Sequence, residues 1–79
     1  MHMTLQELSH QYRADADVFA ARIRQLEQRK AQTQDEDERW QLHRRINELR
    51  PLLRQSRALA ELTGHYYDRG YRKHAQYQL

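Results

Sequence analysis

The stretch WQLHRRINELRPLLRQSRALAELTGHYY, from Trp40 to Tyr67, decides the fold. Read at intervals of three and four residues, it carries an apolar stripe with small side chains in its second half. The stripe consists of Leu42, Ile46, Leu49, Leu53, Ser56, Ala60, Thr63 and Tyr67. This spacing predicts a long amphipathic helix. A second row beside it consists of Leu52, Leu59, Leu62 and Tyr66. One helix cannot easily cover both rows, so we expect one partner helix within the chain and a further partner outside it.

A matching stripe lies in the N-terminal part of the chain. Thr4 and Glu7 have the spacing of a capping box, and no glycine or proline follows for many residues, so we expect a helix from about residue 5 to about residue 32. Its stripe consists of Leu5, Leu8, Tyr12, Ala16, Phe19, Ile23 and Leu26, which is six steps over 21 residues. This average step equals the heptad period of a coiled coil. Val18 lies off this stripe.

The acidic segment TQDEDE, residues 33–38, predicts the connection between the two helices. Either Thr33 with Glu36 or Asp35 with Glu38 can cap the second helix. We expect this helix to run from about residue 36 to about residue 69, with a tail over residues 70–79.

Two helices of similar length joined by a short loop predict an antiparallel hairpin. A fold near residue 34 places Leu8 opposite Ala60 and Phe19 opposite Leu49, so that large side chains often meet small ones. The predicted fold is therefore all-α, with residues 1–79 forming one coiled-coil-like two-helix hairpin. Because the second leucine row stays uncovered, we expect two hairpins to form a homodimeric four-helix bundle.

Two residues interrupt the helical pattern of the second helix. Pro51 lacks a backbone N–H and crowds the carbonyl of Asn47. The helix either bends and continues, or stops near Leu49 and restarts with Pro51 in its first turn. The stripe keeps its phase across Pro51, which favours a continuous helix kinked there. Gly64 either ends the helix early or lets another backbone approach closely.

Composition limits the function classes. The chain has 79 residues, 38% hydrophobic and 32% charged, and no cysteine. So small a domain buries little apolar surface, and without disulfides its natural route to stability is oligomerisation. We expect a cytoplasmic location, because cysteine is absent and no signal peptide or membrane-spanning run is recognisable.

An enzyme is not expected. The chain has no cysteine nucleophile and no glycine loop for phosphate. His65 and His74 lack the spacing of helical metal ligands, so neither a metal nor a cofactor is expected. The residues indicate a non-enzymatic module for protein–protein interaction or oligomerisation. The candidate interface residues are Val18, Trp40, Leu52, Leu59, Leu62 and Tyr66.

Nucleic-acid binding, in a small binding or regulatory protein, is the alternative. Residues 51–79 hold five Lys or Arg against two acidic residues. Arginine and lysine can contact phosphates, and the tyrosines of the tail can stack on bases or fold back on the helices. The candidates are Arg44, Arg45, Arg50, Arg54, Arg57, Arg69, Arg72 and Lys73.

The beginning of the chain, MTLQEL, and its end, YYDRGYRKHAQYQL, resemble a group of short proteins from Firmicutes genomes, often carried on mobile elements. The resemblance covers nearly all of the chain. It implies a bacterial cytoplasm and a tail that belongs to the protein. The group has no assigned activity, so the resemblance assigns no functional residue.

Overall fold

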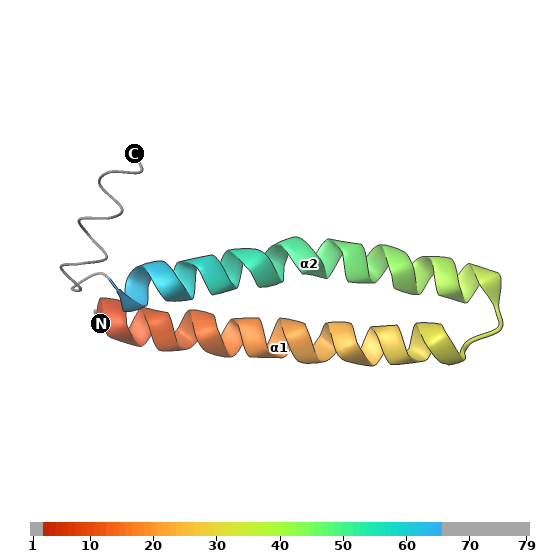
Figure 1. Cartoon of the computed structure of the whole chain (residues 1–79), viewed down its shortest axis with the longest axis horizontal. Helices are drawn as coiled ribbons and strands as arrows, with labels where there is room; N and C mark the ends of the chain where they lie inside the picture. The colour runs from red at the N-terminus through yellow and green to blue at the C-terminus, as the bar shows by residue number, and fades with distance from the viewer. Residues whose placement is uncertain (1–2, 66–79) are drawn as a thin grey trace.

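The computed structural model describes residues 3–65, which form two helices. Helix α1 spans Leu5–Gln32 and helix α2 spans Glu36–Gly64, and they pack side by side in opposite directions (Figure 1). The predicted all-helical hairpin is thus confirmed, and no strand occurs among residues 3–65. The expected end of the second helix near residue 69 and the tail lie outside the described residues.

Each helix begins at a side-chain cap. The Thr4 hydroxyl accepts a hydrogen bond of 3.0 Å from the Glu7 N–H at the start of α1. At the start of α2, the Asp35 carboxylate accepts from the N–H groups of Asp37 and Glu38. The sequence allowed either Thr33 or Asp35 to cap the second helix, and in the structure Asp35 is the cap. Three acidic residues then occupy the first turn of α2, where the helix dipole favours negative charge.

A small hydrogen-bond network closes the connection. The Thr33 hydroxyl donates to Glu38 Oε2 at 3.1 Å, and Arg29 Nε donates to Glu38 Oε1 at 3.1 Å. The Arg39 guanidinium donates to the Thr33 carbonyl at 2.8 Å. Glu38 therefore joins the end of α1, the loop and the start of α2, which fixes where the chain turns back.

The larger core side chains lie in the half of the hairpin nearer the loop. Ile23 and Leu26 of α1 pack with Leu42, Ile46 and Leu49 of α2, and Phe19 and Leu53 pack against this cluster. Ile46 is the most buried, with 2% of its surface exposed. All of these residues belong to the two predicted stripes.

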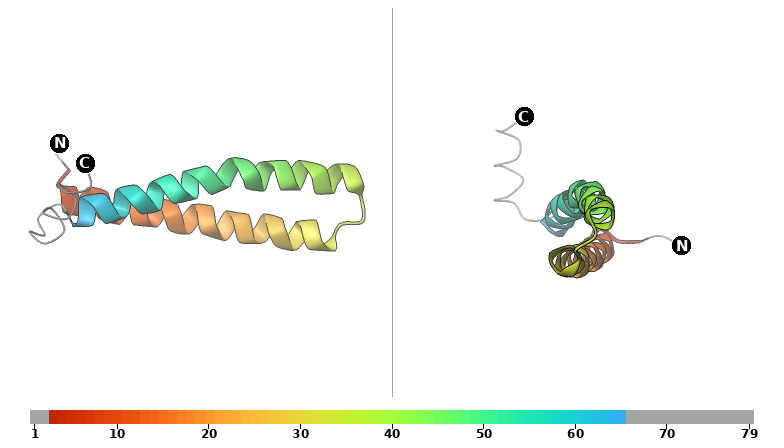
Figure 2. Two further views of the ribbon diagram at one scale, coloured as in Figure 1. Left: turned by 45° about the horizontal axis from the view of Figure 1, so that its top comes forward. Right: turned by 90° about the vertical axis from the view of Figure 1, so that its right-hand side faces the viewer.

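Small side chains form the seam near the chain ends. Ser9 is buried, and its hydroxyl donates to the Ala60 carbonyl at 3.0 Å. A Cβ atom added at Gly64 would lie 2.8 Å from Ser9 Oγ. The helices can therefore approach closely here, and their axes cross along the hairpin (Figure 2). Gly64 is the last residue of α2 and also lies at this close approach.

The buried Ser9 corrects one member of the first stripe. The sequence assigned Leu8 to the seam opposite Ala60, but the Ser9 side chain makes that contact and Leu8 is only half-buried. With Ser9 in place of Leu8, the stripe alternates steps of four and three without exception from Leu5 to Leu26. The seam of α1 is thus a regular heptad repeat.

Helix α2 continues through Pro51 without a break. Pro51 is exposed and lies on the side of α2 away from the seam, between the flanking residues Arg50 and Leu52. The Asn47 carbonyl, which loses its helical donor to the proline, therefore faces water that can hydrogen-bond to it. This position explains why one proline is tolerated in the middle of a long helix.

The cap at Asp35 gives a testable prediction. Replacing Asp35 with Ala removes two hydrogen bonds to backbone N–H groups and should lower the free energy of unfolding by about 1 kcal/mol. Asp37→Ala is the matched control, because it removes the same charge from the same turn but no cap. It should cost only about 0.3 kcal/mol. Urea denaturation followed by circular dichroism measures both, and equal losses would contradict the role of the cap.

The contact between Ser9 and Gly64 gives a second prediction. Gly64→Ala alone should not stabilise the hairpin, because its new methyl group displaces the Ser9 hydroxyl and breaks the bond to Ala60, a loss of about 1 kcal/mol. In a Ser9→Ala background the same change should stabilise by about 0.5 kcal/mol or more, since only the helix preference for alanine remains. Thermal unfolding of the wild type, the two single variants and the double variant measures this coupling. Additive changes in the free energy of unfolding would refute the contact.

Candidate interaction surfaces

The hairpin leaves two flanks open, one on each side of the seam. No described residue outside the two helices and their loop covers either flank (Figure 2). Cross-helix ion pairs identify the flanks. Arg29 Nε lies 3.1 Å from Glu38 Oε1 on one, and an Arg50 guanidinium nitrogen lies 3.2 Å from Glu27 Oε1 on the other. These pairs are exposed and contribute little stability. They show which heptad positions lie on each flank, so that other residues can be assigned to a flank by their position in the repeat.

The flank with the Arg29–Glu38 pair carries most of the uncovered aliphatic side chains. We call it the apolar flank and define it by Leu8, Val18, Leu52, Leu59 and Leu62. Val18 is 66% exposed, Leu52 42% and Leu62 51%, while Leu8 and Leu59 are half-buried. The row that the sequence left without a partner helix within the chain is therefore also uncovered in the hairpin. Tyr66, the last candidate of this row, lies outside the described residues.

Trp40 lies on the other flank. It borders a hollow with Lys30 and His43, and the heptad repeat places it in line with Asn47 and Arg54. The Trp40 side chain is 61% exposed, and the Arg44 guanidinium lies 5.7 Å from the centre of its ring. Trp40 and the leucine row, which the sequence grouped as one candidate interface, are therefore on opposite sides of the hairpin.

The arginines predicted to contact nucleic acid also divide. Arg44 and Arg45 both pair with Glu48, at 3.6 and 3.3 Å, and Arg45 lies on the apolar flank. Arg50 pairs with Glu27. Arg54 and Arg57 make no ion pair or side-chain hydrogen bond within residues 3–65. The remaining candidates, Arg69, Arg72 and Lys73, lie beyond the described part of the chain.

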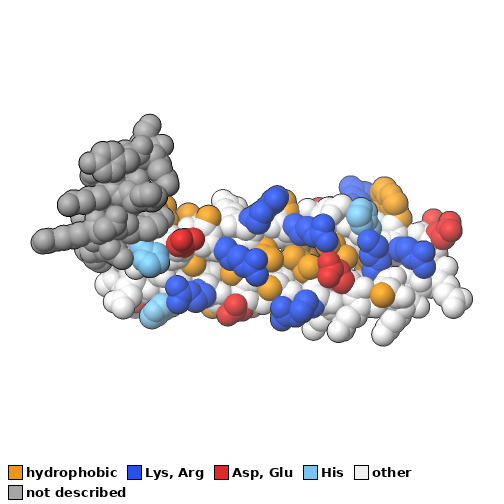
Figure 3. Space-filling view, in the orientation of Figure 1, with side chains coloured by type: hydrophobic (Ala, Val, Ile, Leu, Met, Phe, Trp, Pro, Cys, Tyr) orange, Lys and Arg blue, Asp and Glu red, His pale blue; other side chains and the backbone are white. Residues whose placement is uncertain are grey.

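Cations of α1 join those of α2 on the flank of the Arg50–Glu27 pair. We call this the basic flank. It is defined by Arg13, Arg24, Lys30, Arg39, Arg50, Arg54 and Arg57, with the acidic residues Asp17, Glu27, Glu36 and Glu61 among them. Figure 3 shows a face on which Lys and Arg side chains of both helices surround a narrow line of apolar atoms. The α1 members were not expected from the sequence, because they occupy three different heptad positions and form no single row along α1.

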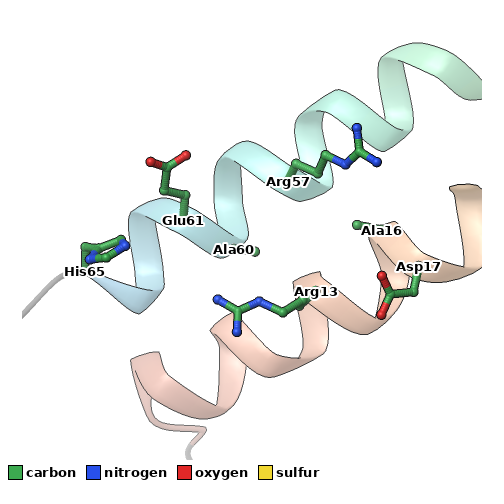
Figure 4. Close-up of a pocket in the computed structure, with 7 residues that line it drawn as sticks. All are labelled: Arg13, Ala16, Asp17, Arg57, Ala60, Glu61 and His65. Atoms are coloured by element: carbon green, nitrogen blue, oxygen red, sulfur yellow. The ribbon is translucent and has the colours of Figure 1, made fainter.

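Two hollows lie on the basic flank. One, of about 250 Å³, lies between the helices near the chain ends, and Figure 4 shows its lining residues Arg13, Ala16, Asp17, Arg57, Ala60, Glu61 and His65. The small side chains of Ala16 and Ala60 leave the space, while the Arg13 and Arg57 guanidinium groups point in opposite directions along it (Figure 4). The second, of about 340 Å³, lies beside Trp40 and is also lined by Glu36 and Arg39.

Hydrogen bonds order the side chains around the second hollow. Lys30 Nζ lies 3.0 Å from His43 Nδ1, and His43 Nε2 lies 3.1 Å from the Asn47 side-chain amide. The lysine ammonium and Asn47 Nδ2 are both donors and a neutral imidazole has one acceptor nitrogen, so His43 accepts a hydrogen bond from one of the two at a time. The His43 ring is thus held between α1 and the next turn of α2.

Among residues 3–65, no group of three or more His, Asp or Glu side chains is placed to hold a metal ion. Neither described helix is long and apolar enough to cross a membrane. No family model, no curated protein and no solved structure matches the chain. Function is therefore inferred from the two surfaces, an apolar flank and a basic flank on opposite sides of one hairpin.

Proposed function

We propose that the chain is a non-enzymatic self-association module, in which two hairpins pair through their apolar flanks to form a four-helix bundle. The observation that carries the proposal is the row of exposed or half-buried leucines, Leu52, Leu59 and Leu62, with Val18 and Leu8 on the same flank. Exposed apolar side chains that gather on one surface are typical of protein interfaces.

The small core supports the same proposal. The buried hydrophobic residues within the described chain are Ala16, Ile23, Leu26, Leu42, Ile46, Leu49 and Ala60. Two of these seven are alanines, which bury little area. Domains of this size rarely reach useful stability from one such core. Adding a second copy lets each leucine on the flank contribute up to about 2 kcal/mol.

The dimensions of the flank suit a dimer. Two helices of 28 and 29 residues are each about 42 Å long and together about 20 Å wide. One flank therefore offers on the order of 800 Å², which is what each partner contributes to a standard interface. A two-fold axis would bring the same surface of both copies together, as in most homodimers.

Charge on the apolar flank does not oppose pairing. In the half nearer the loop, Arg22, Arg29 and Arg45 accompany Glu38 and Glu48, and Asp15 lies among the aliphatic residues. Three cations are thus matched by three carboxylates.

The proposal includes a bend of α2 at Pro51, which would curve the helix where the leucine row begins. It also places the module in a bacterial cytoplasm.

The oligomeric state tests the proposal. Sedimentation at micromolar concentration should show a dimer, and the melting temperature should rise with protein concentration because association and folding are linked. The variant Leu52→Gln/Leu59→Gln should raise the dissociation constant roughly 100-fold or more, since each dimer loses four apolar side chains from the interface.

Trp40→Gln is the matched control. It makes an exposed apolar residue polar, but on the basic flank, and should leave the dissociation constant within about threefold of the wild type. A compact wild-type monomer whose melting temperature is independent of concentration would overturn the proposal. So would a dimer that Trp40→Gln disrupts and Leu52→Gln/Leu59→Gln does not.

A further inference from the structure

We propose that the basic flank, together with Trp40, binds single-stranded nucleic acid. This binding uses the side of the hairpin opposite the apolar flank, so it does not depend on self-association. The residue set differs from the one expected from sequence. Arg13, Arg24 and Lys30 of α1 and Arg39 of α2 enter it, Arg44 and Arg45 leave it, and Arg69, Arg72 and Lys73 lie outside the described residues.

The charge on the two flanks is unequal. The basic flank holds seven cations against four carboxylates, whereas the apolar flank holds three of each. Four of the seven cations, Arg13, Arg24, Arg54 and Arg57, make no ion pair or side-chain hydrogen bond in the part of the chain that the structure describes. Their guanidinium donors are therefore available to phosphate oxygens, for which the planar arginine group is well suited.

The spacing of these arginines suits an extended polyanion. Arg50, Arg54 and Arg57 follow one another along α2 over about 10 Å. Arg57 of α2 and Arg13 of α1 line the same hollow near the chain ends, with their guanidinium groups pointing in opposite directions along it, and the small side chains of Ala16 and Ala60 leave this space (Figure 4). A strand lying along this seam could place successive phosphates between cations from both helices.

Trp40 adds a contact that charge alone does not provide. Most of its indole is in contact with solvent, and Arg44 holds the ring through a cation–π contact. The adjoining hollow carries the side chains of Lys30, Arg39 and His43. An exposed aromatic ring among cations is a platform on which an unpaired base can stack while its phosphate contacts arginine or lysine.

A single strand fits this combination better than other anionic ligands. The bases of a duplex are already stacked on one another, so their faces cannot reach Trp40. An acidic peptide would contact the arginines, but its Asp and Glu side chains offer no flat ring that could stack on Trp40. A single strand presents both phosphates and base faces in one flexible ligand.

Two signals from the full-length protein test the proposal. A fluorescein-labelled oligothymidylate should bind with rising anisotropy at about 50 mM salt and much more weakly at about 200 mM. The same oligonucleotide, unlabelled, should quench the fluorescence of Trp40, which is the only tryptophan of the chain. Duplex DNA of equal length and polyglutamate should not quench it.

Two pairs of substitutions locate the binding surface. Arg54→Gln/Arg57→Gln should lower the slope of log affinity against log salt by about 1.4, because each phosphate contact to a single strand accounts for about 0.7. Arg22→Gln/Arg45→Gln is the matched control, since it changes the net charge equally on the apolar flank, and it should leave the slope unchanged. Trp40→Leu should weaken binding roughly 5- to 150-fold.

Several results would overturn the proposal. One is the absence of oligothymidylate binding at low salt. Another is equal weakening by the two arginine pairs, which would indicate attraction by net charge alone. Binding without quenching, or polyglutamate binding as tightly as the oligonucleotide, would assign the basic flank to acidic protein segments instead. Circular dichroism of each variant at the assay temperature establishes that a loss of binding is not a loss of fold.

Discussion

Two packed helices share one seam, and this constraint determines the rest of the hairpin. The seam buries the heptad stripe of α1 against that of α2, with the large residues around Ile46 near the loop and small residues near the chain ends. The Ser9–Ala60 hydrogen bond fixes the register where aliphatic packing is weakest. Any apolar or charged residue outside the two stripes must lie on an open flank. The flanks of a hairpin this small therefore carry most of its chemistry.

Much of this fold was readable from the sequence because heptad spacing is a strong local signal. Every residue of the loop-side core belongs to a predicted stripe. The prediction failed at Leu8, where hydrophobicity suggested a leucine and the structure buries Ser9. A stripe with strictly alternating steps of four and three residues would have included Ser9. A prediction selects this polar residue over Leu8 only if it gives the period more weight than the hydrophobicity of the side chain. The choice between the caps at Thr33 and Asp35 depended on backbone geometry, which spacing does not specify.

The surfaces were less predictable, because a flank is shared by two helices. Leu52 and Leu62 could be identified as unpartnered from α2 alone, and both are exposed. Placing Trp40 on the opposite side required the register between the helices. The same holds for Arg13 of α1, which lines one hollow with Arg57 only after the chain has folded back. Which arginines are free also depends on carboxylates such as Glu27, 23 residues from its partner Arg50. Composition along one helix carries no such information.

The close approach of the two helices near the chain ends has a consequence for groups that are joined to the hairpin. Because Ser9 touches both Ala60 and Gly64, the chain enters and leaves the hairpin side by side. Thr4 and His65 therefore lie at the same end of the hairpin, so that groups held at these two residues would have a high local concentration, as two groups on a short tether do. In a symmetric pair of hairpins, the relative direction of the two copies would decide whether four such groups gather at one end of a rod or separate as two pairs at opposite ends. The hairpin is thus also a spacer whose length is set by its helices, about 42 Å.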